Sequence, residues 1–269
     1  MLQIKNSLKI SSAILLMATS FWSQATVVEV RTSLGNIQIN LFDETTPKTV
    51  ENFLNYVNSG SYANNLIHRS VPGFIIQGGG FTYADDPATG GILLDNIPTD
   101  ISVINEPKLS NIRGTVSMAK GSDPDSAKAQ WFINLNDNAQ SLDVVSNSGG
   151  FTVFGQVIGD GMQVADAISG LSIFQYAAPF GEIPLRNFTM SDFDNGDALS
   201  DDNIVVITDI VVTDAAVVTN PDINPRVNSL INASSGGSGS DVVGSSGGGS
   251  VFWLALMTFC SIQVRKRFK

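Results

Sequence analysis

Short apolar segments rich in β-branched residues, separated by glycine-containing turns, constrain the fold of this chain more than any other feature. Only two stretches have helical spacing of apolar residues: one between Thr46 and Gly60, and one over Met162–Ile168. Many short strands with two helices predict a mostly β protein whose antiparallel sheet closes on itself. The segments predicted as strands are Val27–Arg31, Ile37–Leu41, Ile67–Arg69, Phe74–Gln77, Thr115–Ala119, Trp131–Asn134, Val153–Val157 and Ile204–Val212.

The first 25 residues have the pattern of an export signal. Lys5 and Lys9 precede the apolar stretch Ile10–Trp22, and the small residues Ser23 and Ala25 suit cleavage after Ala25. The alternative is a buried N-terminal helix. We therefore predict a signal peptide at residues 1–25 and a single exported domain at 26–213.

The C-terminal region divides into a linker and a tail. Residues 214–250 are predicted to be a flexible linker, because 14 of the 17 residues from Ser234 to Ser250 are Gly or Ser. Residues 251–269 begin with a 14-residue apolar run and end in a basic cluster. A helix of that run spans only ~21 Å against a hydrocarbon core of ~30 Å, so it would be a marginal membrane anchor.

The order of these features resembles the GlyGly-CTERM sorting tail of Gram-negative bacteria. That resemblance implies an exported protein that is held, at least transiently, in the inner membrane and is then trimmed. The basic end suits a cytoplasmic C-terminus. We expect the protein in the periplasm of a Gram-negative bacterium, tethered to the inner membrane or released after tail processing. The alternative is a short amphipathic or disordered tail.

Charge and composition exclude several function classes. Residues 26–213 carry 8 basic and 22 acidic side chains, a net charge of −14, so nucleic acid is not expected as a partner. His68 is the only histidine and Cys260 the only cysteine. The chain therefore has no set of residues for a His/Cys zinc site, a Cys-His pair within the domain or an internal disulfide. The domain also lacks a GxSxG motif, which disfavours a serine hydrolase. No metal or cofactor is predicted.

One segment connects the chain to a known family. HRSVPGFIIQGGG, at His68–Gly80, resembles the cyclophilin signature FHRxxxxFxxQGGD. GTVSMAKG at Gly114–Gly121, AQWFINL at Ala129–Leu135 and FTVFGQV at Phe151–Val157 follow in cyclophilin order and at similar spacing. The N-terminal TSLGNIQINLF and PKTVENF extend the likeness, which covers about residues 27 to 213.

The resemblance implies a fold and an activity. Cyclophilins are peptidyl-prolyl cis-trans isomerases, or rotamases, and act in protein folding on proline-containing polypeptides. Their fold is an eight-stranded closed antiparallel β-barrel capped by two α-helices. We expect a monomer of this kind. The alternative is a cyclophilin-like chaperone module that binds proline-containing peptides without turnover.

The resemblance also assigns roles to individual residues. Arg69 matches the catalytic arginine, and Gln77 matches the side chain that positions it and the substrate carbonyl. The positions that match the proline pocket, the adjoining groove and the pocket edge are Phe74, Ile75, Phe132, Leu142, Ala119, Gln130 and His68. Without the motif, Phe74 and Phe132 would be read as residues of the barrel interior, and His68 as a buried histidine without a chemical part.

The chain departs from the family pattern at several positions. Gly80 stands where the signature ends in Asp, and Lys120 stands where many members have Asn. Phe151 stands where many members have His, and Ser141 stands where cyclosporin-binding members have Trp. We therefore expect weak cyclosporin binding. An acidic insertion, Phe174–Asp202, contains the run DFDNGD. This run is similar to a calcium-binding loop, but its glycine comes one place too early for an EF-hand and no glutamate follows at the required spacing. We therefore interpret the run as a solvated loop.

Overall fold

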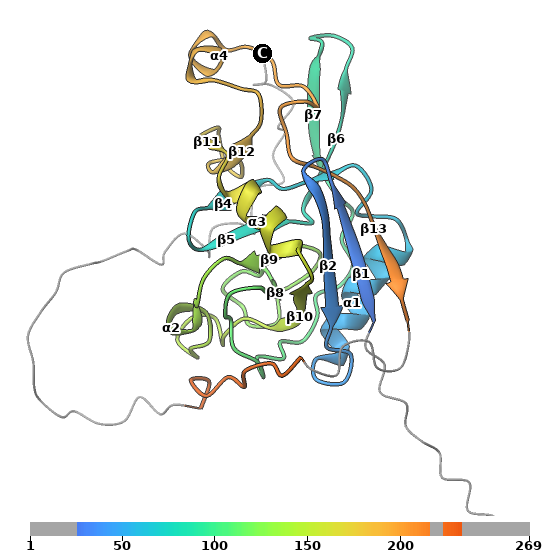
Figure 1. Cartoon of the computed structure of the whole chain (residues 1–269), viewed down its shortest axis with the longest axis vertical. Coiled ribbons are helices and arrows are strands. Elements are labelled where there is room, and N and C mark those ends of the chain that lie inside the picture. The colour runs from blue at the N-terminus through green and yellow to red at the C-terminus, as the bar shows by residue number, and fades with distance from the viewer. Residues whose placement is uncertain (1–25, 216–222, 233–269) are drawn as a thin grey trace, which may run out of the picture.

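A closed antiparallel barrel forms the body of the molecule (Figure 1). The computed structural model describes residues 26–215 and 223–232. Successive strands of the barrel are hydrogen-bonded in the order β4-β5-β9-β8-β10-β2-β1-β13-β3. Their bounds are β1 Val27–Thr32, β2 Gly35–Leu41, β3 Asn65–Leu66, β4 Arg69–Val71, β5 Ile75–Gly78, β8 Thr115–Met118, β9 Trp131–Asn134, β10 Val153–Ile158 and β13 Val206–Asp214.

The barrel closes because β3 and β4 are two parts of one bent stretch of chain. Leu66 of β3 pairs with Val206 of β13, and Arg69 of β4 pairs with Gln77 of β5. Between them, the amide of Ile67 donates to the carbonyl of Val205 on one side. The amide of His68 donates to the carbonyl of Gln77 on the other. With β3 and β4 counted together, the predicted eight-stranded closed antiparallel barrel is confirmed.

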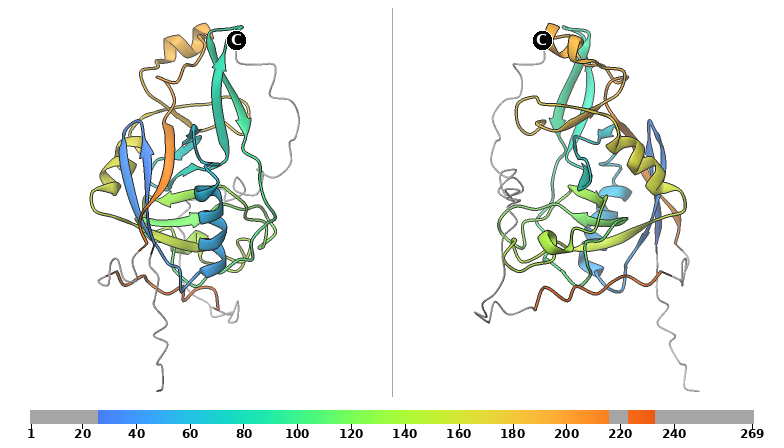
Figure 2. Two further views of the ribbon diagram at one scale, coloured as in Figure 1. Left: turned by 90° about the vertical axis from the view of Figure 1, so that its right-hand side faces the viewer. Right: turned by 60° about the vertical axis from the view of Figure 1, so that its left-hand side comes forward.

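The two longer helices of the described chain are the predicted ones. Helix α1 spans Pro47–Asn58 and buries Val50 and Phe53, while α3 spans Gly161–Ser169 and buries Ala165 and Ile168. All four of these side chains join the core inside the barrel. Figure 2 shows the two helices on different sides of the strands. Each helix buries one apolar stripe, as its sequence spacing predicts.

A second apolar cluster lies outside the barrel, in the upper part of Figure 1. It joins a hairpin, a two-stranded sheet and a short helix, none of which was predicted. Their bounds are β6 Phe81–Asp86, β7 Gly91–Asn96, β11 Ser172–Phe174, β12 Ile183–Leu185 and α4 Met190–Asn195. The acidic residues of the hairpin interrupt its apolar alternation, which explains why sequence periodicity misses it.

The run DFDNGD is part of an ordered segment, so its interpretation as a loop was wrong, although its residues are exposed or only partly buried, as expected for a solvated run. Most of the DFDNGD run belongs to α4, whose first turn is capped by Thr189. The side chains of Thr189 and Asp192 each accept a hydrogen bond from the other residue's backbone amide, which is a capping box. The helix ends at Gly196, whose φ of 73° is in the left-handed region that glycine tolerates.

A C-terminal strap, which we define as residues 223–232, lies against the barrel (Figure 1). Val227 forms a β-bridge with Leu109. The amide of Ser110 donates to the carbonyl of Arg226 at 2.8 Å, and the amide of Asn228 donates to the carbonyl of Lys108 at 2.9 Å. These residues belong to the range 214–250 that the sequence predicted to be a flexible linker. The prediction missed the strap because its contacts, made by backbone atoms and by the side chains of Arg226 and Asn228, are with residues far away in the chain and have no local sequence signature.

The predicted signal at 1–25 and tail at 251–269 lie outside the described residues. Within residues 26–215 and 223–232, no helix combines the length and apolar character that a membrane crossing requires.

Candidate active site

Three residues of the predicted site form a row across neighbouring strands. Arg69 of β4 is paired with Gln77 of β5, and Gln77 is paired in turn with Phe132 of β9. Paired residues of an antiparallel sheet project from the same face. The strand register therefore brings these side chains together, although 63 positions separate Arg69 from Phe132 in the chain.

The row lies on the outer face of the barrel. The residues that alternate with it, Ile76, Trp131 and Ile133, belong to the core inside the barrel. Because successive side chains of a strand point to opposite faces, Gln77 and Phe132 point outward. Phe132 therefore does not fill the barrel interior, which is the commoner place for a phenylalanine of a β-strand.

Phe132 belongs to an outer apolar cluster, which we define as Ile75, Phe132, Leu142 and Phe151 with the partly buried Val71, Phe74 and Ala119. The rings of Phe132 and Phe151 meet edge to face, with their centroids 5.9 Å apart. All five apolar residues predicted to contact substrate are in this cluster. Phe151 and Val71, which were not predicted to contact substrate, complete it.

Hydrogen bonds link Arg69 to the other polar residues of the site. Its side chain is only 10% exposed. Its Nη1 donates to Oε1 of Gln77 at 3.4 Å, and Nε2 of Gln77 donates to Oε1 of Gln130 at 2.7 Å. Its Nε donates to Oε2 of Glu182 at 2.7 Å. The predicted residues Gln77 and Gln130 thus form a chain that ends on the guanidinium.

Glu182 is the polar neighbour that sequence reasoning missed. It lies 113 positions after Arg69, within the acidic insertion, and no motif includes it. Glu182 is one of several acidic residues in a segment without regular apolar spacing, so nothing in the neighbouring sequence indicates that Arg69 is its partner.

His68 is fully buried, and its ring packs edge-on against Phe81 with centroids 4.8 Å apart. Burial, with a further contribution from the charge of Arg69, lowers the pKa of His68 to about 3. The imidazole is therefore neutral at ordinary pH. The ring lies next to Arg69, but a neutral imidazole is not expected to act there as a general acid.

Lys120 replaces a frequent asparagine of the family and lies at the border of the outer apolar cluster. Its Nζ is 4.8 Å from the centroid of the Phe151 ring and donates to the carbonyl of Ser148. Burial lowers the pKa of Lys120 to about 8, against the opposing effect of Asp125 and Asp123. The ammonium is thus held over an aromatic face, an arrangement that favours the cation.

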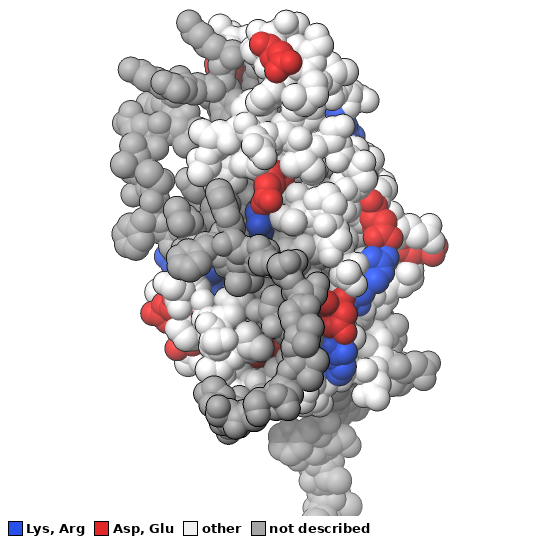
Figure 3. All heavy atoms as spheres, turned by 90° about the vertical axis from the view of Figure 1, so that its left-hand side faces the viewer, with Lys and Arg blue, Asp and Glu red and all other residues white. Residues whose placement is uncertain are grey.

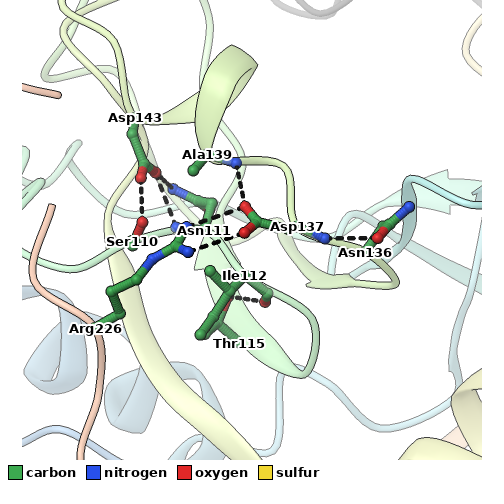
Figure 4. A network of polar contacts seen from close by, with 9 residues as sticks. All are labelled: Ser110, Asn111, Ile112, Thr115, Asn136, Asp137, Ala139, Asp143 and Arg226. Carbon is green, nitrogen blue, oxygen red and sulfur yellow. Dashed lines mark hydrogen bonds and ion pairs between the residues drawn. The ribbon is translucent and has the colours of Figure 1, made fainter. Parts of the chain in front are cut away.

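Leu142 reaches the cluster from a short helix, α2 (Ala139–Leu142), whose two ends are anchored by aspartates (Figure 4). Asp137 accepts a hydrogen bond from the amide of Ala139 at 3.1 Å and two from Arg226 of the strap, at 2.9 and 3.0 Å. The hydrogen bonds from Arg226 lower the pKa of the Asp137 carboxyl.

Asp143 anchors the other end of α2. It is fully buried and accepts hydrogen bonds from the Ser110 hydroxyl and from the backbone and side chain of Asn111. These three donors satisfy a carboxylate that burial would otherwise penalise.

Charges on the side of the molecule shown in Figure 3 are sparse and mixed. Lys and Arg atoms form small separate patches, several of them next to Asp or Glu atoms. Within residues 26–215 and 223–232, no group of three His, Cys, Asp or Glu side chains is arranged to hold a metal ion.

Comparisons with known proteins point to one family. The family model described as "Cyclophilin type peptidyl-prolyl cis-trans isomerase/CLD" matches residues 27–190. The chain is 43% identical over 164 residues to peptidyl-prolyl cis-trans isomerase A of Dickeya dadantii, a match that covers 60% of this chain and 80% of that protein. It is 40% identical over 154 residues to peptidyl-prolyl cis-trans isomerase B of Escherichia coli, covering 54% and 85%.

Among solved structures, a cyclophilin type peptidyl-prolyl cis-trans isomerase of Cryptosporidium parvum superposes with a TM-score of 0.48 at 25% identity, covering 71% of this chain and 98% of that one.

Proposed function

Because this chain belongs to the family of cyclophilin-type peptidyl-prolyl cis-trans isomerases, and so is an enzyme of that class, we propose that Arg69 accelerates rotation about X-Pro bonds by donating a hydrogen bond to the prolyl nitrogen. Resonance keeps the peptide bond planar, with a barrier of ~18–20 kcal/mol. In the twisted transition state conjugation is lost, and the nitrogen becomes pyramidal and regains a lone pair. A donor aimed at that lone pair stabilises the transition state selectively, because the planar amide nitrogen is a poor acceptor.

The observation that carries the proposal is a preoriented guanidinium beside an apolar surface. Arg69 and Phe132 project from the same outer face of the barrel, with Gln77 between them. Within the described part of the chain, the hydrogen bonds of Arg69 use Nε and Nη1 and leave Nη2 available. The guanidinium therefore has a donor for the substrate while its orientation is already restrained.

The other site residues have supporting roles. The outer apolar cluster holds the pyrrolidine ring while the acyl side rotates, with Val71, Phe74 and Ala119 as its partly exposed members. Gln77 holds Arg69 and offers its side chain to the substrate carbonyl, and Gln130 holds Gln77. The rotation needs no nucleophile and no proton transfer, so the neutral His68 serves as a wall of the site.

The substrates in this proposal are proline-containing segments of exported proteins, on which the enzyme acts as a monomeric folding catalyst in the periplasm. Support comes from the sequence of the two ends: a lysine-first apolar leader, and a Gly/Ser-rich linker followed by an apolar run and a basic cluster. The tail would hold the protein in the inner membrane, at least until it is processed.

Replacement of Arg69 tests the mechanism. Loss of one preoriented donor of this kind typically lowers the rate ~100- to 1000-fold, so Arg69→Ala should lose most turnover. Arg69→Lys should recover little, because an ammonium lacks the planar fork that Gln77 can hold while the substrate is bound. The measurement is NMR exchange on an Ala-Pro peptide, with circular dichroism spectra matched between variants. Equal rates for wild type and Arg69→Ala would remove Arg69 from the mechanism.

A further inference from the structure

We infer that Glu182 is a positioning residue for Arg69: its carboxylate fixes the plane of the guanidinium before substrate binds. The inference rests on the proposed function, in which Arg69 donates to the prolyl nitrogen. Nothing in the family signature includes a carboxylate at the arginine, so this residue adds to the site that the motifs define.

Glu182 contacts the arginine strand through both its side chain and its backbone. Its Oε2 is 2.7 Å from Nε of Arg69, and its carbonyl accepts a hydrogen bond from the amide of Ser70 at 2.8 Å. Ser70 is the residue that follows Arg69 in β4. The backbone hydrogen bond fixes the distance between the two segments, so the carboxylate of Glu182 is held close to the guanidinium of Arg69.

The segment that carries Glu182 is itself firmly packed. Glu182 immediately precedes β12, in which Ile183 and Leu185 are 1% and 2% exposed. Ile183 is paired with Phe174 of β11, and Leu185 forms a bridge with Ile204. The acidic insertion thus works as a scaffold, because the apolar cluster that orders it also delivers one carboxylate to the site.

Two acceptors on different nitrogens restrain a guanidinium more than one does. Glu182 holds Nε while Gln77 holds Nη1, so rotation of the planar group breaks at least one of these bonds. At 2.7 Å the bond to Glu182 is short and charge-assisted, whereas the 3.4 Å contact to Gln77 is at the outer limit for a hydrogen bond. Glu182 therefore supplies the stronger part of the restraint.

The expected loss of activity on removing Glu182 depends on how exposed its ion pair with Arg69 is. Arg69 is mostly buried, but the Glu182 side chain is 42% exposed, so solvent screens part of its interaction. A hydrogen bond between charged groups is worth more than a neutral one, yet much less than the loss of Arg69 itself. We expect kcat to fall about tenfold when Glu182 is truncated, with little change in KM, because the restraint concerns the donor to the transition state.

The experiment compares wild type with Glu182→Ala, Glu182→Gln, Arg69→Ala and a matched control, Asp166→Ala. Asp166 makes a similar ion pair, at 2.7 Å, with Arg113, and the two side chains are half exposed. For each protein, kcat and KM are measured separately on an Ala-Pro peptide. In the forms that keep Arg69, the Nε–H resonance of that residue is followed by NMR.

Glu182→Ala should lower kcat about tenfold and shift the Arg69 Nε–H resonance, while Asp166→Ala should change neither. Glu182→Gln should recover part of the rate, since its amide oxygen still accepts from Nε without the charge. This nearly isosteric variant also serves if Glu182→Ala does not fold.

Two results would overturn the inference while leaving the proposed function intact. One is full activity in both Glu182 variants alongside an inactive Arg69→Ala. The other is a loss of kcat with the Arg69 resonance unchanged, which would indicate a structural effect elsewhere. If Arg69→Ala itself keeps full activity, the proposed function fails instead.

Discussion

The side chains around Arg69 differ in charge because they differ in burial and in partners. Glu182 is partly exposed and paired, whereas His68 is fully enclosed and lies next to a cation. The enclosed imidazole therefore stays neutral, and the guanidinium of Arg69 is the charged donor beside it. A reaction that rotates a bond without moving a proton needs no more than this.

The buried His68 should make folding stability depend on pH. Its pKa is about 3 in the folded protein and ~6.5 in the unfolded chain, so below pH 6.5 the unfolded chain binds a proton that the folded one does not. The free energy of unfolding should fall by about 1.4 kcal/mol per pH unit between those values, or about 2 kcal/mol by pH 5.

The measurement is urea unfolding at pH 7, 6 and 5, with His68→Gln as the control. The variant removes this titration but keeps the other acidic and basic groups, so the difference between the two slopes isolates His68. If the free energy of unfolding depends on pH equally in wild type and His68→Gln, then His68 has the same pKa in the folded and unfolded states, which would contradict the prediction.

Ser141 should limit cyclosporin binding. It lies in α2 next to Leu142, and its hydroxyl donates to the carbonyl of Asn138 at 3.0 Å. A serine offers far less contact area than the tryptophan of cyclosporin-binding family members. Ser141→Trp should therefore tighten binding, measured by calorimetry, and tight binding by the unmodified protein would contradict the prediction.

At the scale of elements, α2 depends on partners far from it in the chain. The strap holds Asp137 before the helix, while Ser110 and Asn111 hold Asp143 after it (Figure 4). Because α2 supplies Leu142, these contacts fix one wall of the outer apolar cluster. The strap is therefore part of the folded domain and supports the site indirectly.

Asn228 should contribute more to this support than Arg226. Asn228 is buried, and its side chain donates to the carbonyls of Asp143 and Pro107 and accepts from the amides of Leu230 and Ile231. Asn228→Ala leaves these groups unpaired and should lower the free energy of unfolding by about 2 kcal/mol.

Arg226→Ala removes an ion pair whose side chains are about half exposed, so it should cost less than about 1 kcal/mol. Urea unfolding of both variants, and of a chain truncated after Asp214, measures the ranking. The truncated chain should be at least as unstable as Asn228→Ala. A truncated chain as stable as one ending at residue 232 would show that the strap contributes nothing.

At the scale of the whole molecule, the barrel divides apolar side chains between an inside and an outside. The inner core joins the helices to the strands, and the strand residues of the outer apolar cluster lie on the opposite face of β4, β5 and β9. Each strand of the barrel is hydrogen-bonded to a neighbour on both sides. Arg69, Gln77 and Phe132 sit on these strands, which position side chains more exactly than loops do.

Deletion of Val251–Lys269 should release the protein from the inner membrane. The only other strongly apolar segment, Ile10–Trp22, is removed with the signal in this proposal. Fractionation of native cells that express the intact and deleted forms measures this, and mass spectrometry of the mature protein locates both of its ends. Identical fractionation of the two forms would exclude a sorting role for the tail.

Local patterns were enough to predict most of the barrel. Short runs rich in β-branched and aromatic residues, such as Trp131–Asn134, predicted the strands, and the HRxxxxFxxQGG spacing singled out Arg69, Phe74 and Gln77 as candidate site residues. The strand predictions succeeded because residue type and turn spacing are properties of neighbouring residues. The strand register then brought Arg69, Gln77 and Phe132 together, as the family resemblance implied.

Tertiary structure alone decided the contacts between distant segments. The ion pair between Arg69 and Glu182, the strap on Leu109 and Ser110, and the hairpin β6–β7 have no signature in any short stretch of sequence. Each depends on where loops cross the outside of a closed barrel, and backbone hydrogen bonds there can be made by almost any residue. The sequence by itself therefore determined the barrel and the position of Arg69 in it, while the folded chain decided which residues hold the side chain of that arginine in place.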